Sequence, residues 1–189
     1  MAIILGIDTS AIDLAPDTFS AAYDGQDGFS HKNRFLMLID FPNFVNPKPN
    51  PETTNLMVES ATMPGNRVLV KEYQFDGPQK KIPYSTAVEE LTVSFLLTGN
   101  YSIYVAFSQW LEAIINMDIY SIAYKNDITM DMEVYQLDKE NKKTLGKKMI
   151  SAFPIMLSPL EFSNTTPNDL QRVNVTFVFD RYDIITHKA

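Results

Sequence analysis

The chain has 189 residues, of which 45% are apolar, so it is long enough for one domain with a hydrophobic core. It has no cysteine and only two histidines, which excludes disulfides and thiolate chemistry and argues against a histidine-based metal site. The net charge of −7 is uneven: residues 1–30 carry five Asp and no Lys, Arg or Glu, whereas residues 31–189 carry 18 acidic and 16 basic groups. The body is therefore close to neutral and lacks the basic field with which proteins grip nucleic acid.

Residues 1–30 show no sustained hydrophobic period. They are interpreted as an N-terminal extension with at most a short strand or helical turn, or else as a disordered leader. The early run AIILGI is too short to span a membrane and follows no basic residue, so neither a signal peptide nor a membrane anchor is expected. The folded domain is expected at residues 31–189.

The first strand is expected at residues 33–42, where both faces are largely apolar. The proline-rich residues 42–51 follow as a loop, because proline cannot donate to a strand ladder. A second strand is expected at residues 55–62. A third, at residues 67–77, opens a long hairpin or projecting arm that extends over residues 67–85.

Residues 89–97 alternate as a half-buried strand does. Its inner face carries Leu91, Val93, Phe95 and Leu97, and its outer face Glu90, Thr92 and Ser94. Residues 101–117 are the one credible helix, with a possible cap at Asn100 or Ser102. Its apolar stripe comprises Ile103, Phe107, Trp110, Leu111 and Ile114. Trp110 is interpreted as a core anchor rather than a binding residue.

Residues 129–137 form a strand that returns through residues 147–153 as a hairpin. Two strand-like segments are then joined by a loop containing Pro154, Pro159 and Pro167. The second segment, residues 172–182, has Val173, Val175, Phe177 and Phe179 on one face and Asn174, Thr176 and Asp180 on the other. The predicted fold is mainly β: an antiparallel barrel or sandwich of seven or eight strands, one flanking helix and a projecting hairpin arm.

Motifs for nucleotide binding, nucleophilic catalysis or histidine metal ligation are absent, so no catalytic, cofactor-binding or metal-binding residue is predicted. Asp131 and Glu133 share a strand face, as the two acids of a glycosidase can. Solvated strand positions are the favoured interpretation of that pair. The lysine cluster at residues 139–148 is interpreted as a solvated hairpin or a contact with an acidic protein rather than a nucleic-acid site.

Several segments, taken in order, carry a resemblance to a known family. They are NRFLMLIDF, ATMPG, EYQFDGPQKKIPYS, ELTVSFLL, the helix with Phe107 and Trp110, and the closing AFPIMLSPLEFSNTTPNDLQRVNVTFVFDRYDI. Over residues 33–185 the chain resembles a tail tube protein of contractile-tailed, T-even-like bacteriophages, a family shared with the inner tubes of contractile injection machines. Residues 1–30, 42–51 and 118–128 depart from the family pattern as an extension and two insertions.

The resemblance implies a structural subunit without enzyme activity or cofactor. Its copies would stack as six-fold rings around a channel that double-stranded DNA crosses on ejection, without sequence-specific binding. A sheath protein would wrap the outside, and baseplate or initiator and terminator proteins would meet the two ends. The expected location is the virion tail tube, assembled in the host cytoplasm.

On this basis three surfaces are assigned. The channel wall is expected to carry Glu90, Thr92, Ser94, Asp131, Glu133, Asn174, Thr176 and Asp180. The arm between rings is expected to use Lys71, Asp76, Lys80, Lys81, Ile82 and Tyr84. The outer, sheath-facing surface is expected to carry Gln109, Glu112, Asn116, Lys142 and Lys143. The alternatives are a tube initiator, the inner tube of an injection system and, more distantly, a β-sandwich binding module or hydrolase using Asp131 and Glu133.

Overall fold

The computed structural model describes residues 3–4, 7–8, 30–73, 79–116, 121–163 and 169–186. The strands of the body are β3 (Phe35–Leu38), β4 (Val58–Ala61), β7 (Leu91–Leu96), β10 (Met130–Leu137), β11 (Lys143–Leu157), β12 (Arg172–Val178) and β13 (Arg181–Thr186). Three two-stranded pairs are β1 (Ile3–Ile4) with β2 (Ile7–Asp8), β5 (Asn66–Tyr73) with β6 (Lys80–Val88), and β8 (Ile115–Asn116) with β9 (Ser121–Ile122). The helices are α2 (Pro51–Leu56), α3 (Ser102–Ile114) and α4 (Lys125–Ile128).

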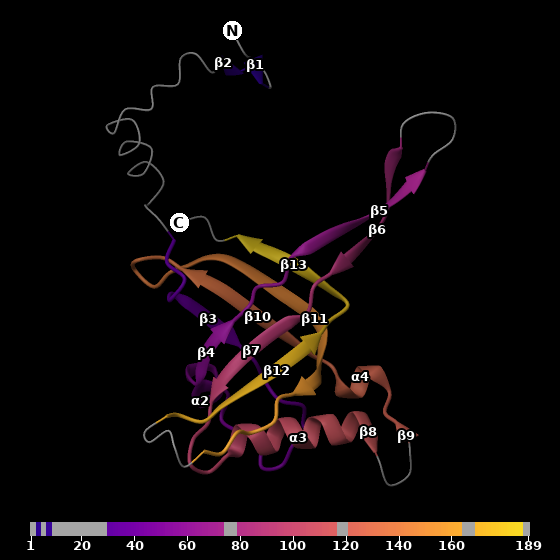
Figure 1. The fold of residues 1–189 in the computed structure, drawn as a ribbon. Helices are drawn as coiled ribbons and strands as arrows, with labels where there is room; N and C mark the ends of the chain where they lie inside the picture. Colours follow the sequence, from indigo (N-terminus) through magenta and orange to yellow (C-terminus); the bar gives the residue numbers. More distant parts are fainter. Residues whose placement is uncertain are drawn as a thin grey trace.

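The body is one antiparallel sheet in the order β3-β10-β11-β12-β7-β4, with β13 also paired to β11 (Figure 1). The first part of β11 pairs with β10 and β13, and its last part pairs with β12. Strands β3 and β4 stand at the two edges, each with one partner among the described strands, so this sheet does not close into a barrel. The predicted mainly β, antiparallel fold is confirmed.

Strand β11 changes direction at Ser151, where it passes from one half of the sheet to the other. Ser151 has a φ of 57°, a left-handed conformation that is uncommon for a residue with a side chain. Its N–H donates to the Asp131 carboxylate at 3.2 Å, and the Asp180 N–H donates to the Ile150 carbonyl at 3.1 Å. These two bonds satisfy backbone groups that the bend takes out of the regular ladder.

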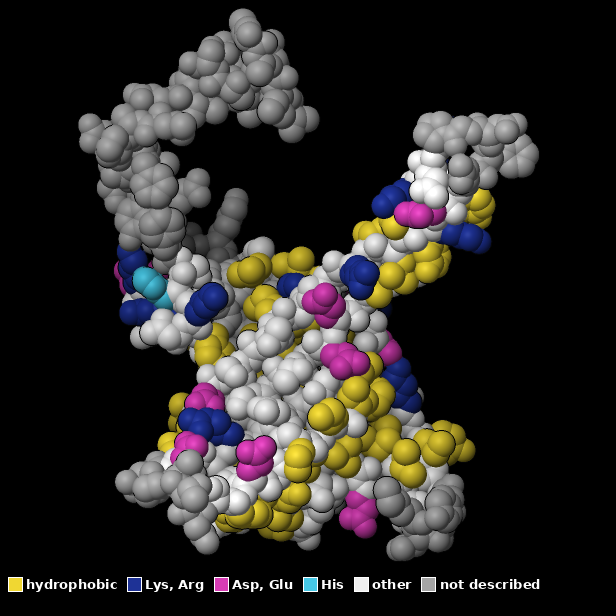
Figure 2. All heavy atoms as spheres, viewed as in Figure 1, with side chains coloured by type: hydrophobic (Ala, Val, Ile, Leu, Met, Phe, Trp, Pro, Cys, Tyr) yellow, Lys and Arg dark blue, Asp and Glu magenta, His cyan; other side chains and the backbone are white. Residues whose placement is uncertain are grey.

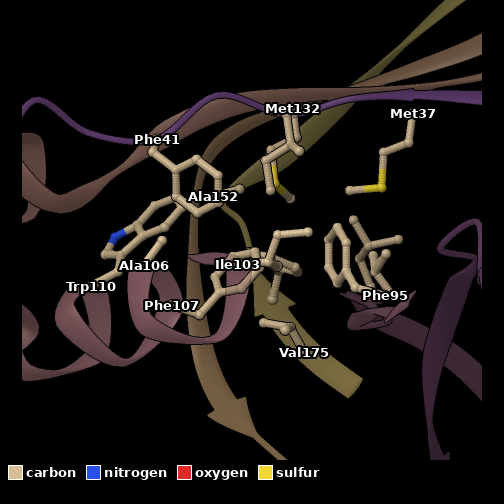
Figure 3. Packing of buried hydrophobic residues seen from close by; sticks show 14 of the residues in the cluster. Met37, Phe41, Phe95, Ile103, Ala106, Phe107, Trp110, Met132, Ala152 and Val175 are labelled. Atoms are coloured by element: carbon tan, nitrogen blue, oxygen red, sulfur yellow. The ribbon is translucent and has the colours of Figure 1, made fainter. Parts of the chain in front are cut away.

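An aromatic cluster joins α3 to the sheet and fills the core (Figure 3). Phe107 lies at its centre: its ring is 5.1 Å from that of Phe41, 5.2 Å from Phe95 and 5.8 Å from Phe177, measured between centroids. Trp110 is fully buried, and its indole N–H donates to the Ile128 carbonyl at 2.7 Å. The prediction that Trp110 is a core anchor is confirmed.

The helix predicted at residues 101–117 is observed over Ser102–Ile114, with Ile103, Phe107 and Trp110 buried as expected. Ala106 completes the buried stripe in place of Leu111 and Ile114, which are half-buried. Tyr101 occupies the cap position without a side-chain cap bond, while Asn100 accepts the Ser102 N–H at 3.3 Å. Residue 117 lies outside the described residues.

The strand predicted at residues 55–62 is wrong at its start, because the chain is helical until Leu56 and the strand covers only Val58–Ala61. Asn50 accepts the Glu52 N–H at 3.0 Å, and Pro51 occupies the first helical turn. A capping asparagine followed by proline is a helix start signal. The strand expected at residues 33–42 is likewise shorter, at Phe35–Leu38.

Two predictions about the C-terminal stretch need correction. Pro154 lies within β11, buried, and not in the connecting loop; the register shifts between Pro154 and Met156, where a residue without an N–H can be accommodated. Residues 172–182 form two strands, since the chain bends at Asp180 and β13 then pairs with the first part of β11. The predicted apolar face is confirmed, because Val173, Val175 and Phe177 of β12 and Phe179 just after it are all buried.

Candidate assembly surfaces

Strands β5 and β6 form the predicted arm, which projects from the body at its upper right (Figure 1). Their register runs from Asn66 opposite Val88 to Tyr73 opposite Lys80, with one irregularity between Leu69 and Val70. The arm residues predicted to meet a neighbour, Lys71, Lys80, Lys81, Ile82 and Tyr84, are all exposed. Asp76 lies outside the described residues. A hairpin of two strands has no core of its own, so the arm remains a candidate contact surface.

Two bonds that sequence reasoning missed hold the base of the arm, one within the hairpin and one to the body. The Glu89 N–H donates to the Gly65 carbonyl at 3.2 Å, which ties the two ends of the hairpin together. The Lys147 ammonium donates to the Pro64 carbonyl at 2.6 Å and lies 4.2 Å from the ring centroid of Tyr182. Sequence analysis placed this lysine in a solvated cluster. Lys147 lies on the core-facing side of β11, opposite the buried Val134, and this position distinguishes it from the solvated lysines of the cluster.

Four of the residues assigned to the channel wall come together on the polar face of β7 and β12. Thr92 lies opposite Thr176, and Ser94 lies opposite Asn174. These four side chains are uncharged and at least partly exposed. The structure therefore contains a neutral, hydroxyl- and amide-bearing patch where alternation predicted one.

The four acidic residues of the same assignment lie elsewhere. Lys148 pairs with Asp131 at 3.2 Å and with Glu133 at 4.0 Å, and Asp183 lies opposite this lysine on β13. Asp180 pairs with Lys125, while Glu90 is exposed just before β7. Three of the four acids thus have a cationic partner, but Asp131 and Glu133 share Lys148 and Asp183 lies opposite it, so this one cation does not balance the carboxylates around it.

Tyr135 shares a strand face with Glu133 and is nonetheless buried. Its hydroxyl donates to the Glu133 carboxylate at 2.9 Å, and Lys143 lies 4.1 Å from its ring centroid. Burial raises the pKa of Tyr135 above its ordinary value of 10.0, and the bond to Glu133 raises it further. Asp131 and Glu133 therefore act as partners of Lys148 and Tyr135 in the part of the sheet that the structure describes.

The residues assigned to the outer surface fall into two separate groups. Glu112 and Asn116 are exposed at the C-terminal end of α3 and on β8, whereas Gln109 holds the preceding loop through two hydrogen bonds with the Asn46 backbone, at 2.9 and 3.0 Å. Lys142 and Lys143 lie at the turn between β10 and β11, away from α3 (Figure 1). The hydrogen bond with Glu140 raises the pKa of Lys142. The helix face and the lysine turn are consequently separate candidates for a partner.

A groove of about 630 Å³ lies where the sheet stays open, between the edge strands β3 and β4. Its lining includes Phe35, Ala61, Met63, Val134 and Tyr135. The outward backbone groups of β3 and β4 have no strand partner among the described residues. Unpaired edges of this kind are templates for contact with another chain.

Across the described residues, no helix has the length and apolar composition needed to span a membrane. Nor does the described part of the chain hold a group of three or more His, Asp or Glu side chains suited to binding a metal ion. The features that stand out are instead surfaces: an exposed arm, two open strand edges and a neutral polar face.

The family model described as phage tail tube protein matches residues 30–185. The chain belongs to the phage tail tube protein family. As a member, it is a structural tail tube protein rather than an enzyme, as predicted. A comparison with curated protein sequences gives no match.

Solved structures support the same fold at low sequence identity. A chain from the cryo-EM structure of the anti-feeding prophage cap, the AFP tube-terminating cap, has a TM-score of 0.61 and 17% identity, covering 96% of this tail tube chain and 100% of its own. A chain from the PVC extracellular contractile injection system, sheath-tube complex in the extended state, has a TM-score of 0.58 and 16% identity, covering 93% and 100%. A chain from the PVC sheath/tube terminator structure has a TM-score of 0.58 and 15% identity, covering 81% and 94%.

Proposed function

We propose that this tail tube protein polymerises into stacked six-fold rings, whose channel passes double-stranded DNA when the phage ejects its genome. The observation that carries the proposal is the arm, which leaves Val68, Val70, Ile82 and Tyr84 at least 48% exposed in the single chain. Several exposed apolar side chains gathered on one projecting element mark a surface for contact with a partner. Copies of the same chain in the next ring are the partner that this family membership favours.

The polar face of β7 and β12 is our candidate for the channel wall. Its neutral side chains, including Thr92 and Asn174, offer few fixed cations on which phosphate could be held. The adjoining face carries Asp131 and Glu133 around the single cation Lys148, so it would repel phosphate rather than hold it. A wall of this composition would let DNA slide without sequence-specific or electrostatic capture.

The proposed tube would also have protein partners along its outer surface and at its two ends. We propose that a sheath protein contacts the exposed side of α3, where Glu112 faces solvent, and that initiator or baseplate and terminator proteins meet the two ends of the tube. Chains of similar fold occur in structures described as a sheath-tube complex, a sheath/tube terminator and a baseplate. The assembled tube would form in the cytoplasm of the bacterial host.

Negative-stain electron microscopy of the purified chain tests this function. We expect rings with a central hole, or longer tubes, without any added protein. Assembly only on an added baseplate would instead identify a tube initiator. A monodisperse monomer under all assembly conditions would contradict a ring-forming role. The same fold likeness also admits the inner tube of a contractile injection system, which a particle without packaged DNA would indicate.

A further inference from the structure

The groove between β3 and β4 is open although its lining is mainly apolar. Its volume of about 630 Å³ lies in the range of about 300–1,000 Å³ that is common for sites that bury a sizeable ligand. The buried Val134 lines it together with the half-buried Phe35, Ala61 and Met63. The charged Glu59 at its rim is paired with Arg172 at 2.8 Å. The groove therefore fits an uncharged, apolar chain segment better than a charged ligand.

The groove also offers backbone groups for hydrogen bonding. Among the described strands, β3 pairs only with β10, and β4 pairs only with β7. The Ile39 N–H, just after β3, is already satisfied because it donates to the Asn55 side chain of α2 at 3.0 Å. The part of β3 beside Phe35 keeps an edge to which a further strand can be added. Strand addition would thus combine apolar burial with main-chain hydrogen bonds.

One segment of this chain has matching chemistry. Residues 2–7, AIILGI, contain five apolar residues, one glycine and no charge. Three of the six are isoleucine, which favours strands because its branched side chain packs well on a pleated surface. Strands β1 and β2 pair with each other over only two residues each. A ladder this short is not stable on its own, so the segment requires an apolar surface to pack against.

The covalent connection keeps this segment close to the groove. Residues 9–29 join it to the body, and about 20 residues can span at most roughly 65 Å. The described body begins at Ser30, and Lys32 and Asn33 already line the groove. The tether therefore starts at the rim of the site. Tethering gives an effective concentration on the order of millimolar, which favours the same chain over a second copy in dilute solution.

The charges of the tether favour the same placement. Residues 8–29 carry five Asp and no Lys, Arg or Glu. Lys32 is exposed at the groove, and the Arg34 guanidinium donates to the carbonyls of Asp138 and Lys139 at 3.2 and 2.7 Å. Lys and Arg side chains gather on this side of the body, near the turn between β10 and β11 (Figure 2). An acidic tether is attracted to these cations at short range, while the uncharged segment enters the apolar groove.

We propose that residues 2–7 of each chain dock in the groove between β3 and β4 of the same chain and add to the open strand edge beside Phe35. The docked segment covers Ala61 and Met63 and provides the missing main-chain partners. Covering a strand edge in this way prevents two free copies from pairing edge to edge. The contact lies within one chain, so it requires neither rings nor DNA.

Cysteine pairs test the docking directly, because the natural chain contains no cysteine. Neighbours along a strand alternate, so either residue 3 or residue 4 faces the groove. In dilute solution, at least one of the variants Ile3→Cys/Ala61→Cys and Ile4→Cys/Ala61→Cys should form an intramolecular disulfide, measured as the loss of both free thiols in a chain that stays monomeric. The control Ile4→Cys/Ile122→Cys should keep its thiols, since β9 does not line the groove.

Hydrogen exchange provides a second measurement, without cysteine. The variant Ile3→Asp/Ile4→Asp carries two charges that an apolar groove does not accommodate. The amides of β3 and β4 that border the groove should then exchange about tenfold faster than in the natural chain. The control Ala21→Asp/Ala22→Asp adds the same charge to the tether and should leave their exchange unchanged.

Three results would contradict docking within one chain. One is a disulfide that forms as readily when chains carrying only Ile4→Cys or Ile3→Cys are mixed with chains carrying only Ala61→Cys, since it places the segment on a second copy. Another is the absence of a disulfide from both paired variants. The third is unchanged exchange in Ile3→Asp/Ile4→Asp. All these measurements use dispersed chains, so a failure to form rings or tubes would contradict the proposed function and leave the docking intact.

Discussion

The sheet body and the arm treat their apolar side chains in opposite ways. In the body, Phe95, Phe107 and Trp110 are fully buried and contact one another through their rings. In the arm, Val68 and Tyr84 are 57% and 65% exposed, although both strands are regularly paired. The body therefore has what a folded domain needs within one chain, whereas the arm has only its backbone ladder.

This difference separates folding from assembly. Burial of apolar surface stabilises a fold within one chain, and the same surface left exposed becomes available to a partner. Substitutions in the body should lower the free energy of unfolding and reduce assembly as a consequence. Changes in the arm should reduce assembly and leave the unfolding of the single chain almost unchanged.

The largest expected effect is that of Phe107→Ala, at the centre of the aromatic cluster. Removing a buried phenyl ring leaves a cavity and should lower the free energy of unfolding by about 3–5 kcal/mol. Urea unfolding monitored by Trp110 fluorescence measures it. Val105→Ala on the exposed side of the same helix is the matched control, with an expected change within about 0.5 kcal/mol. Equal losses in the two variants would contradict the assignment of the core.

A smaller loss is expected for Gly146→Ala, which tests the packing of Tyr135 on β11. A Cβ at residue 146 would lie 2.4 Å from a ring carbon of Tyr135, too close for either group to stay in place. Overpacking of this kind costs about 1–3 kcal/mol. Gly99→Ala meets no atom within 4 Å and serves as the control for the substitution itself. A similar unfolding midpoint for the two variants would show that the ring moves freely.

The next largest effect is a pH dependence of the free energy of unfolding that arises from Tyr135. The pKa of Tyr135 is raised in the folded chain, so folding favours the protonated phenol: this stability is fully present below about pH 10 and is lost as pH rises through the folded-state pKa. Tyr135→Phe removes the hydroxyl and should cost about 1 kcal/mol at pH 8. The difference in free energy of unfolding between wild type and variant should be smaller at pH 11. A difference that instead widens as pH rises would contradict a raised pKa of Tyr135 in the folded chain.

Sequence patterning predicted the elements whose two faces differ strongly. Val173, Val175 and Phe177 alternate with polar residues and are all buried, because a period of two leaves one choice of core face. The α3 stripe follows from the helical period in the same way. The hairpin arm was predicted from a turn signal between two strand-like runs of residues. The sequence did not indicate which surface contacts the arm.

At two positions tertiary contacts override the local pattern. Tyr135 sits on a face shared with charged residues, yet it is buried because the residue across the ladder, Gly146, has no side chain. Pro154 stays within a strand because a register shift removes the need for its N–H. Each depends on a residue of a neighbouring strand, which the sequence around the position itself does not contain.

Among the candidate surfaces, the neutral patch could be predicted from the sequence, whereas the ion pairs could not. Thr92 and Thr176 lie opposite each other because alternation and register agree. The pairing of Asp180 with Lys125 joins residues 55 positions apart, across the bend after β12. No local pattern contains that contact.

The most direct test of the separation between folding and assembly is a chain that lacks residues 76–83. This deletion removes the outer half of the arm and keeps the four ladder pairs from Asn66 opposite Val88 to Leu69 opposite Ser85. We predict a wild-type free energy of unfolding, within about 0.5 kcal/mol, together with no tubes in negative-stain electron microscopy. Tubes with an unchanged length distribution would contradict the account.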